Sequence, residues 1–365
     1  MNIGIIGSGA REHSICYKLK KSKIVNNLYC MPGNAGTSEI CKNIDVNINN
    51  FNEIYKVVIS KKIDLLIVGP EVPLVNGITD FFEERNISVF GPSKMASRLE
   101  GSKTFMKKIC KEFSIPSAKY EEINNLKEVD EVLSKFNLPI VIKSDGLAAG
   151  KGVTICKSKE EAAQDIKNIL MGKFKTSKKV IVEEFLIGEE ASYFIITDGK
   201  NYIPIGTAQD HKRIGENDTG LNTGGMGAYS PSSLITDDVD YKIKTKIIEP
   251  TIKAMEKLGY PYKGILYAGL MINKSEPKLI EYNIRFGDPE CQVLMMRLKS
   301  DLLEIIQSTL NNSLNKIKIN WIKDPCITIV AASKGYPEKF EKLKEIKKII
   351  NFKENSNQQL FHYST

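Results

Sequence analysis

Two lysines and three glycines between positions 143 and 152 form the stretch best suited to bind phosphate. Residues 143–152 read KSDGLAAGKG and join two strand-like runs. Glycine lets a backbone approach a ligand closely, and lysine supplies a positive charge for phosphoryl oxygens. The stretch lacks the spacing and the final Ser or Thr of a Walker loop, and a plain hairpin is the alternative. We predict that Lys143 and Lys151 flank a phosphate-binding lid that includes Gly150.

Three further loops follow strand-like runs near the start of the chain. Residues 7–13 read GSGAREH, residues 32–36 read PGNAG, and residues 69–71 read GPE. The first opens a helix, whose backbone N–H groups and dipole can hold an anion. Because parallel strands end at one edge of a sheet, where ligands bind, the three loops are predicted to face one crevice, although each alone is also consistent with a turn. The second loop lacks the acidic residue that an NAD site needs.

A run of carboxylates suits the base and ribose of a nucleotide. Residues 183–190 read EEFLIGEE, with acidic groups on both sides of a short apolar linker. Backbone groups at Phe185 and Leu186 could meet adenine while Glu190 accepts ribose hydroxyls. A solvated acidic turn is the alternative.

A carboxylate and an amide two residues apart form the best candidate metal site. Glu281 and Asn283 lie in a strand-like run, so their side chains point to one face. Such oxygen ligands suit Mg²⁺, which proteins hold with few groups together with nucleotide phosphates. Arg285, just beyond, can grip a carboxylate or a phosphate. Charges at a strand end are the alternative.

A long glycine-rich loop is predicted between residues 210 and 227. It contains the stretches DHKR (210–213) and TGLNTGGMG (219–227). Long loops in compact proteins are usually functional or disordered. His211 could act as a base, although a lone histidine is more often a structural hydrogen-bonding group. We predict that this loop shapes a substrate pocket.

The elements that must position these residues begin with an α/β pattern. Up to about residue 100, short apolar runs alternate with helical periodicity, which predicts a parallel, doubly wound sheet. The predicted strands are 3–6, 28–31, 65–68 and 88–90. A helix carrying Phe105, Ile109 and Phe113 then leads to a connector at Pro116.

Beyond Pro139 the pattern predicts two α+β lobes. The first has a strand on each side of the glycine-rich turn, a helix near 159–171 and a strand at 180–185. The second has strands at 192–197, 202–207, 265–272 and 278–282 and helices near 239–258 and 289–310. A further strand-containing unit is predicted from Trp321.

Bulk composition restricts the class of protein. A chain of 365 residues, 42% of them hydrophobic, is long enough for more than one packed unit. Its net charge of +8 is spread along the chain rather than gathered with aromatic residues, so nucleic acid is not predicted as a partner. Seven scattered cysteines without C-x-x-C spacing indicate a reducing cytoplasm, and no apolar run predicts a membrane span or a secretory leader.

Taken in order, these segments closely resemble the glycinamide ribonucleotide synthetases, ATP-grasp ligases of purine synthesis, through essentially the whole chain. The most specific stretches are 7–13, 143–152, 208–231 and 281–290. The resemblance implies a multidomain α/β and α+β protein with a preATP-grasp parallel sheet followed by two grasping lobes. The implied domains are an N-terminal substrate domain (1–102), a small lobe with its leading helix (103–190), a large lobe (191–320) and a C-terminal domain (321–365).

The resemblance also implies residue roles. Lys103 and Lys143 would contact ATP phosphates together with Gly150 and Lys151. The adenine pocket would be lined by Glu183, Phe185 and Leu186, and the ribose would be bound by Glu190. The metal ion, Mg²⁺ or Mn²⁺, would be bound by Glu281 and Asn283. The two other substrates would be bound by Gly9, Arg11, Asn34, Glu71, Asp210 and Arg285. The implied catalytic residues are Lys143, Asp210 and Arg285.

The implied reaction joins glycine to 5-phosphoribosylamine at the expense of ATP, through a glycyl phosphate, in a monomer or weak homodimer. The sequence departs from the family at Leu221, where proline is usual, and at Thr365, where the family continues, so the C-terminal domain is expected to be incomplete. Another ATP-grasp ligase or a carboxylase is the nearest alternative. A nicotinamide-dependent oxidoreductase and a non-enzymatic nucleotide-binding protein are more distant ones.

Overall fold

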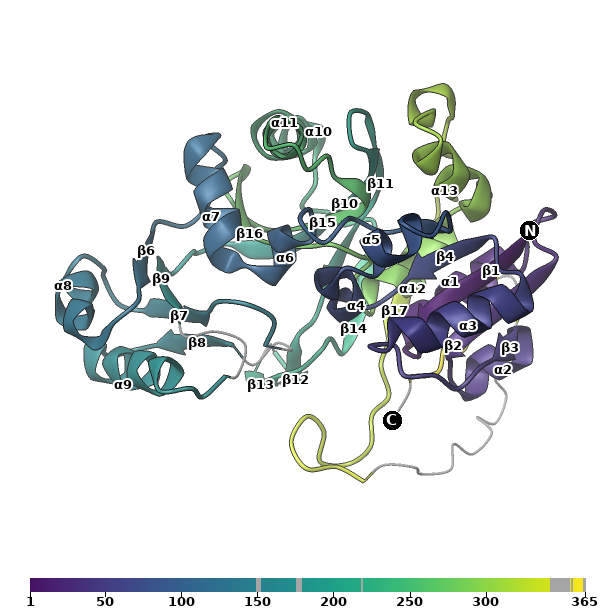
Figure 1. The fold of residues 1–365 in the computed structure, drawn as a ribbon. Helices are drawn as coiled ribbons and strands as arrows, with labels where there is room; N and C mark the ends of the chain where they lie inside the picture. The colour runs from purple at the N-terminus through teal and green to yellow at the C-terminus, as the bar shows by residue number, and fades with distance from the viewer. Residues whose placement is uncertain (149–151, 175–178, 218, 342–354, 356, 364–365) are drawn as a thin grey trace.

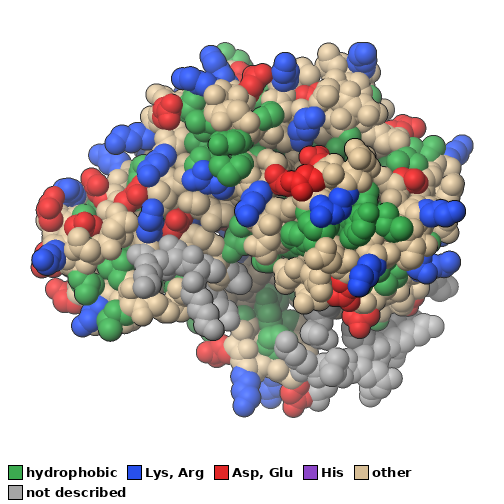
Figure 2. All heavy atoms as spheres, in the orientation of Figure 1, with side chains coloured by type: hydrophobic (Ala, Val, Ile, Leu, Met, Phe, Trp, Pro, Cys, Tyr) green, Lys and Arg blue, Asp and Glu red, His purple; other side chains and the backbone are tan. Residues whose placement is uncertain are grey.

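The computed structural model describes residues 1–148, 152–174, 179–217, 219–341, 355 and 357–363. Three larger β-sheets follow one another across the molecule (Figure 1). A parallel sheet from the N-terminal residues lies at one end, a six-stranded antiparallel sheet lies in the middle, and a four-stranded antiparallel sheet lies at the other end. Lys, Arg, Asp and Glu side chains are interspersed over the face shown in Figure 2. None of the helices in the described ranges is long and apolar enough to cross a membrane.

The N-terminal sheet is parallel throughout, with the strand order β3-β2-β1-β4-β5. Its strands are β1 (Asn2–Gly7), β2 (Asn27–Pro32), β3 (Lys42–Asn43), β4 (Leu65–Val68) and β5 (Ser88–Phe90). Its helices are α1 (Ala10–Leu19), α2 (Ala35–Ile40), α3 (Phe51–Lys61), α4 (Glu71–Asn76) and α5 (Ile78–Glu83). The predicted doubly wound sheet is confirmed. Its direction of winding changes at β1, so the loops after β1, β2 and β4 meet at one edge.

A short connector leads from this sheet into a lobe with a core of its own. The connector holds α6 (Arg98–Gly101) and α7 (Lys103–Glu112). The Pro116 carbonyl then accepts a 2.7 Å hydrogen bond from the Leu279 amide, which ties the connector to the middle sheet. The small lobe, as we call the sheet β6-β9-β7-β8 with its helices, contains β6 (Tyr120–Ile123), η1 (Leu126–Glu128), α8 (Val129–Ser134), β7 (Ile140–Ser144), β8 (Val153–Cys156), α9 (Lys159–Leu170) and β9 (Val180–Glu184).

The middle sheet has the strand order β16-β15-β10-β11-β14-β17, every neighbouring pair being antiparallel. Its strands are β10 (Glu189–Asp198), β11 (Tyr202–Asp210), β14 (Gly227–Ser230), β15 (Lys263–Asn273), β16 (Glu276–Asn283) and β17 (Cys326–Ile329). Its helices are α10 (Asp237–Ile243), the π-helical turn η2 (Lys244–Ile248), α11 (Glu249–Lys257), α12 (Glu290–Arg297), α13 (Leu302–Leu310) and η3 (Leu314–Lys316).

Three features differ from the sequence predictions. The loop predicted at 210–227 contains a small hairpin, β12 (Arg213–Gly215) and β13 (Thr219–Asn222). The helix predicted near 289–310 is broken, because Leu298 takes an extended conformation and Asp301 caps a new helix by accepting a hydrogen bond from the Leu303 amide. The strand predicted after Trp321 pairs with β14 and so extends the middle sheet.

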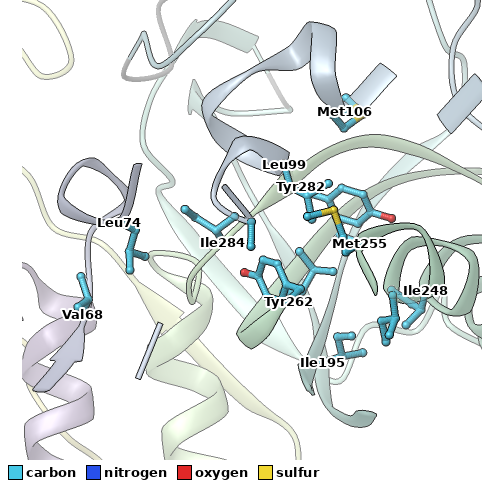
Figure 3. Packing of buried hydrophobic residues seen from close by; sticks show 14 of the residues in the cluster. Val68, Leu74, Leu99, Met106, Ile195, Ile248, Met255, Tyr262, Tyr282 and Ile284 are labelled. Atoms are coloured by element: carbon cyan, nitrogen blue, oxygen red, sulfur yellow. The ribbon is translucent and has the colours of Figure 1, made fainter. Parts of the chain in front are cut away.

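One hydrophobic core joins the parallel sheet to the middle sheet. Val68 of β4 and Leu74 of α4 belong to the same buried cluster as Ile195 of β10. Tyr262 and Ile284 lie between these two groups in Figure 3. The small lobe instead packs around its own cluster, centred on residues such as Ile142 and Ile166. The two larger sheets therefore form one frame to which the small lobe is attached.

Candidate active site

The N-terminus of α7 is fastened to the turn that follows β7. Asp145 accepts hydrogen bonds from the Thr104 amide (3.2 Å) and from the Ser102 hydroxyl (3.2 Å), and Ser102 itself caps α7. Lys103, the first residue of α7, donates to the Gly146 carbonyl at 2.9 Å. Burial lowers the pKa of Lys103, although nearby Glu281 opposes this effect. The helix terminus and the turn thus bring a lysine to the edge of the small lobe.

A second lysine is held at this edge by a buried carboxylate. Lys143 of β7 lies 2.9 Å from Oε2 of Glu183 on the neighbouring strand β9. The other oxygen of Glu183, Oε1, lies 3.2 Å from Nζ of Lys107, one helical turn beyond Lys103. Glu183 is 3% exposed and Lys107 is fully buried. The Glu183 carboxylate, predicted at an adenine pocket, therefore faces two lysines.

Facing these lysines across the junction with the middle sheet is a group of charges on β10, β11 and β16. Lys212 lies 2.7 Å from Glu190 and 3.9 Å from Asp210. Burial alone would lower the pKa of Lys212, but Asp210, Glu190 and Glu281 together hold it above its ordinary value. Glu190, Asp210, Lys212 and Glu281 line one small cavity.

Glu281 lies where the two groups of charges meet. Burial would raise its pKa, but Lys212, Lys143 and Lys103 outweigh that effect and hold the pKa below its ordinary value. Asn283 follows on the same face of β16 and is buried. The described ranges hold no group of three or more His, Cys, Asp or Glu side chains able to bind a metal. The ionised Glu281 and the amide oxygen of Asn283 fit a divalent ion whose other ligands are phosphate oxygens.

The segment between β9 and β10 borders the same region. Phe185 is exposed and Leu186 is half-buried, and both lie outside regular strands. Gly188 has a φ of +155°, and a side chain there would meet the Ile272 carbonyl at 2.4 Å, so only glycine fits this close approach. Gly150 and Lys151 lie outside the described residues.

A second set of charges lies at the edge of the parallel sheet. Arg285 Nε lies 3.1 Å from Glu71, the first residue of α4, and its Nη2 lies 3.6 Å from Glu100. Burial would raise the pKa of Glu71, but Arg285 and Arg11 hold it below its usual range. Burial raises the pKa of Glu100 to about 7, with Arg285 opposing. The arginines are thus close enough to act on one anionic ligand.

Glu12 organises the loop that follows β1. Its carboxylate accepts hydrogen bonds from Nε of Arg11 and from the amide of Gly9, both at 2.6 Å. A side chain at Gly69 would lie 2.0 Å from Oε1 of Glu12, so the loops after β1 and β4 are in close contact. The Gly9 amide, predicted to bind a phosphate, therefore already has an acceptor in this arrangement.

The last described residues pack over the same loop. The amide of His362 donates to Nδ1 of His13 at 2.9 Å, and Asn34 donates to the His362 carbonyl at 2.6 Å. Burial, with a contribution from His362, lowers the pKa of His13 to about 4, so the imidazole is neutral. Tyr363 donates to Asp288 at 2.7 Å. The C-terminal stretch thus forms a wall beside Asn34.

Comparison with known proteins assigns the family. A model of the phosphoribosylglycinamide synthetase N domain matches residues 1–100, and a model of the ATP-grasp (A) domain of the same synthetase matches residues 101–291. The chain belongs to the phosphoribosylglycinamide synthetase family.

Relatives of this family resemble the chain over its whole length. A phosphoribosylamine–glycine ligase of Brucella melitensis is 44% identical, and one of Mesorhizobium japonicum is 46% identical, each alignment covering 100% of this chain and 86% of the relative. A crystal structure of a phosphoribosylamine–glycine ligase from Thermotoga maritima has a TM-score of 0.81 at 32% identity. It covers 93% of this chain and 83% of that one.

In this phosphoribosylglycinamide synthetase chain, most of the predicted site residues fall into two adjoining groups. Those predicted for nucleotide and metal lie at the junction of the small lobe with the middle sheet: Lys103, Lys143, Glu183, Phe185, Leu186, Glu190, Glu281 and Asn283. Those predicted for the other substrates lie around the parallel sheet edge: Gly9, Arg11, Asn34, Glu71 and Arg285. Asp210, predicted with the second set, contacts the first through Lys212.

Several residues of the synthetase site were not predicted from sequence. Glu100 is half-buried and Glu290 is buried, and desolvation is the main cause that raises the pKa of each carboxyl to about 7. Glu290 accepts a hydrogen bond from Ser192 at 3.1 Å and lies near Asp210, which also raises its pKa. The sequence did place Lys107 on the same face of the predicted helix as Lys103, because the two residues are four positions apart. Nothing in the sequence around Glu100 signals its contact with Arg285.

Proposed function

We propose that the chain joins glycine to 5-phosphoribosylamine, converting ATP to ADP and phosphate and giving glycinamide ribonucleotide. One observation carries the proposal. The lysines and the ionised Glu281, suited to a nucleotide and its metal ion, are linked through Glu100 to the charges around Arg285 and Glu71. This arrangement occurs in a chain of the phosphoribosylglycinamide synthetase family.

The nucleotide would lie between the small lobe and the middle sheet. Lys103 and Lys143 would contact its phosphates as point charges. Backbone groups of Phe185 and Leu186 would meet the adenine ring, and Glu190 would accept its ribose hydroxyls. The exposed segment between β9 and β10 supports the position of the base. Glu183 would act at this site by holding Lys143, in addition to the adenine contact inferred from the family.

Glu281 and Asn283 would hold the divalent ion, with Mg²⁺ as the preferred metal and Mn²⁺ as a substitute. The ion would supply positive charge for the phosphate oxygens. The low pKa of Glu281 supports this role, because the carboxylate stays ionised at neutral pH. Gly150 and Lys151, which lie outside the described residues, would also bind the phosphates, as the resemblance implies.

The two other substrates would bind beside the parallel sheet. The carboxylate of glycine would attack the γ-phosphate of ATP, and the amine of phosphoribosylamine would then attack the carbonyl of glycyl phosphate and expel phosphate. Arg285 and Lys143 would neutralise the charge that develops in these steps, and Asp210 would orient the amine. Gly9, Arg11, Asn34 and Glu71 would hold the phosphorylated ribose and glycine. No covalent bond to the enzyme is needed.

We further propose a cytoplasmic monomer or weak homodimer, with domain boundaries near residues 102, 190 and 320. The reduced state of all seven cysteines supports a reducing compartment. The separate core of the small lobe supports a division there.

The test is a coupled assay of ADP release in which each substrate is omitted in turn. We expect ADP to appear only when ATP, glycine, phosphoribosylamine and Mg²⁺ are all present, with glycinamide ribonucleotide identified by mass spectrometry. ADP release with bicarbonate in place of glycine would indicate a carboxylase. Nucleotide binding without ADP release would indicate a binding protein, and either result would overturn the proposal.

A further inference from the structure

Lys107 is a fully buried cation to which the proposed function gives no role. It lies on α7 one turn beyond Lys103, and its side chain has no exposed surface. Lysines are almost never fully buried unless their charge is paired. The amine of Lys107 lies 3.2 Å from Glu183 and donates to the Ala118 carbonyl at 3.1 Å. Its position is therefore fixed by one carboxylate and one carbonyl.

Glu183 is shared between two lysines. One of its oxygens lies 3.2 Å from Lys107, and the other lies 2.9 Å from Lys143. The three side chains together carry one net positive charge. Without Lys107, Lys143 would be the one close cation left to Glu183 among the residues that the structure describes, and Glu183 would cancel the charge that the phosphates need. Lys103 does not compensate, because its amine donates to the Gly146 carbonyl instead.

Stability alone is a weak reason to keep such a buried cluster. Desolvating charged groups is costly, and an apolar side chain of similar volume often does as well in a protein interior. Burial indeed lowers the pKa of Lys107, with Glu183 opposing. A buried lysine behind a phosphate-binding lysine is explained more directly by its effect on the charge of that neighbour.

We infer that Lys107 is a positioning residue that occupies one oxygen of Glu183, so that Lys143 is held in place without being neutralised and can attract the nucleotide phosphates. The inference rests on the proposed role of Lys143 at the ATP site. It concerns nucleotide binding and is independent of which acid the enzyme ligates.

The experiment compares variants by calorimetric titration with ATP and Mg²⁺ in the absence of glycine. Lys107→Met is expected to raise the Kd for ATP about tenfold, the effect of losing roughly one charge interaction. In Lys107→Met/Glu183→Gln, the carboxylate is neutral, so Lys143 regains its free charge. The Kd is expected to fall to within about threefold of that of Glu183→Gln alone, which carries any loss of the contacts that Glu183 itself makes at the site. Lys107→Arg, which keeps the charge, is expected to stay within about threefold of the wild-type value.

Lys108→Met is the matched control, because Lys108 is the next residue on α7 but is largely exposed and lies 3.9 Å from Glu122. Its Kd for ATP should not change. A side chain that merely fills space would not be rescued by Glu183→Gln. The inference is therefore wrong if Lys107→Met binds ATP like the wild type, or if Lys107→Met raises the Kd as much in Glu183→Gln as it does in the wild type.

Two outcomes remain distinct. If Lys107→Met does not fold by circular dichroism, the double variant, which leaves no unpaired carboxylate, decides the matter, and a Kd more than tenfold above that of Glu183→Gln alone overturns the inference. If the wild type binds ATP but consumes no glycine, the proposed function fails while the comparison of ATP affinities still stands.

Discussion

At the scale of single residues, the site depends on which carboxyls are ionised. Glu281 is surrounded by Lys103, Lys143 and Lys212, and these charges keep its pKa low despite burial. Glu290 is more deeply buried, and burial and the nearby Asp210 raise its pKa to about 7. Two glutamates of one site are therefore in different states near neutral pH, because the charges around them differ.

Replacing Glu281 tests the metal and phosphate half of the site. Glu281→Gln keeps the shape of the side chain but removes its charge, and we expect ADP formation to fall by about 100-fold or more. Circular dichroism should show an unchanged fold. Glu276→Gln is the control, since Glu276 lies on the same strand but is exposed and pairs with Lys242 and Lys246. A fully active Glu281→Gln enzyme would remove the metal assignment.

Glu290 predicts how stability changes with pH. Its folded-state pKa of about 7 exceeds the ordinary 4.5, so the folded state binds the proton more tightly. The contribution of the protonated Glu290 to the free energy of unfolding is complete below about pH 4.5 and is lost as the pH rises through about 7. As the pH rises from 5 to 8, the free energy of unfolding of Glu290→Gln should therefore increase by about 2 kcal/mol relative to that of the wild type, measured by thermal unfolding. The exposed Glu304→Gln should show no such difference, and equal shifts for both variants would contradict the prediction.

The sequence predicted these residues unevenly. Lys143, Glu281 and Arg285 could be found because glycine-rich turns and strand ends mark them locally. Glu100 and Lys107 could not be assigned, since their partners are Arg285 and Glu183, which are distant in sequence and meet them only in the folded chain. The motif at residues 7–13 predicted that the Gly9 amide would be available to a ligand. It could not predict that this amide donates to Glu12, because that contact depends on the rotamer of the Glu12 side chain.

At the scale of elements, the ATP site depends on the joint between α7 and the turn after β7. Asp145 accepts hydrogen bonds from Thr104 and Ser102, and Lys103 donates back to the turn. The strands on both sides of the turn were predictable because β-branched residues predominate in them. β3 was not, because it has two exposed residues, and the break between α12 and α13 was missed although Asp301 is a typical helix cap.

Asp145→Ala should loosen this joint. We expect a loss of about 1 to 2 kcal/mol in the free energy of unfolding, because the Thr104 amide and the Ser102 hydroxyl lose their acceptor. The KM for ATP should rise, while the KM for glycine changes little. Asp130→Ala, an exposed aspartate at the start of α8, serves as control. Equal KM values for ATP in the two variants would contradict this role of Asp145.

At the scale of the whole molecule, two sheets share a core and one lobe does not. The cluster joining β4 to β10 makes the parallel and middle sheets one frame. The small lobe has a separate and smaller cluster. Composition and periodicity predicted an α/β unit followed by α+β lobes, but not which units would share a core. They also did not predict that β17 would return to the middle sheet, since pairing between distant strands leaves no local pattern.

Hydrogen exchange should report this difference. Without ligand, amides of β7 and β9 should exchange faster than those of β10 and β15, because the small lobe can open without disrupting the shared core. ADP with Mg²⁺ should slow exchange in β7 and at the start of α7 and leave β1 nearly unchanged. Mass spectrometry of peptic fragments measures both effects. Uniform protection across the three sheets would argue against a separately mobile lobe.

The contact between Glu12 and Gly69 also restricts how this sequence can diverge. Oε1 of Glu12 would lie 2.0 Å from any side chain at position 69, and its Cγ would lie 2.6 Å from one at position 7. A side chain at position 69 can therefore be accommodated only if Glu12 moves or is shortened, and either change gives up the acceptor shared by Arg11 and Gly9. Position 7 is restricted further by its φ of +128°, which a shorter residue 12 would not relieve. A saturation library selected for growth should leave glycine alone at position 69, whereas a library built on Glu12→Ala should admit alanine there.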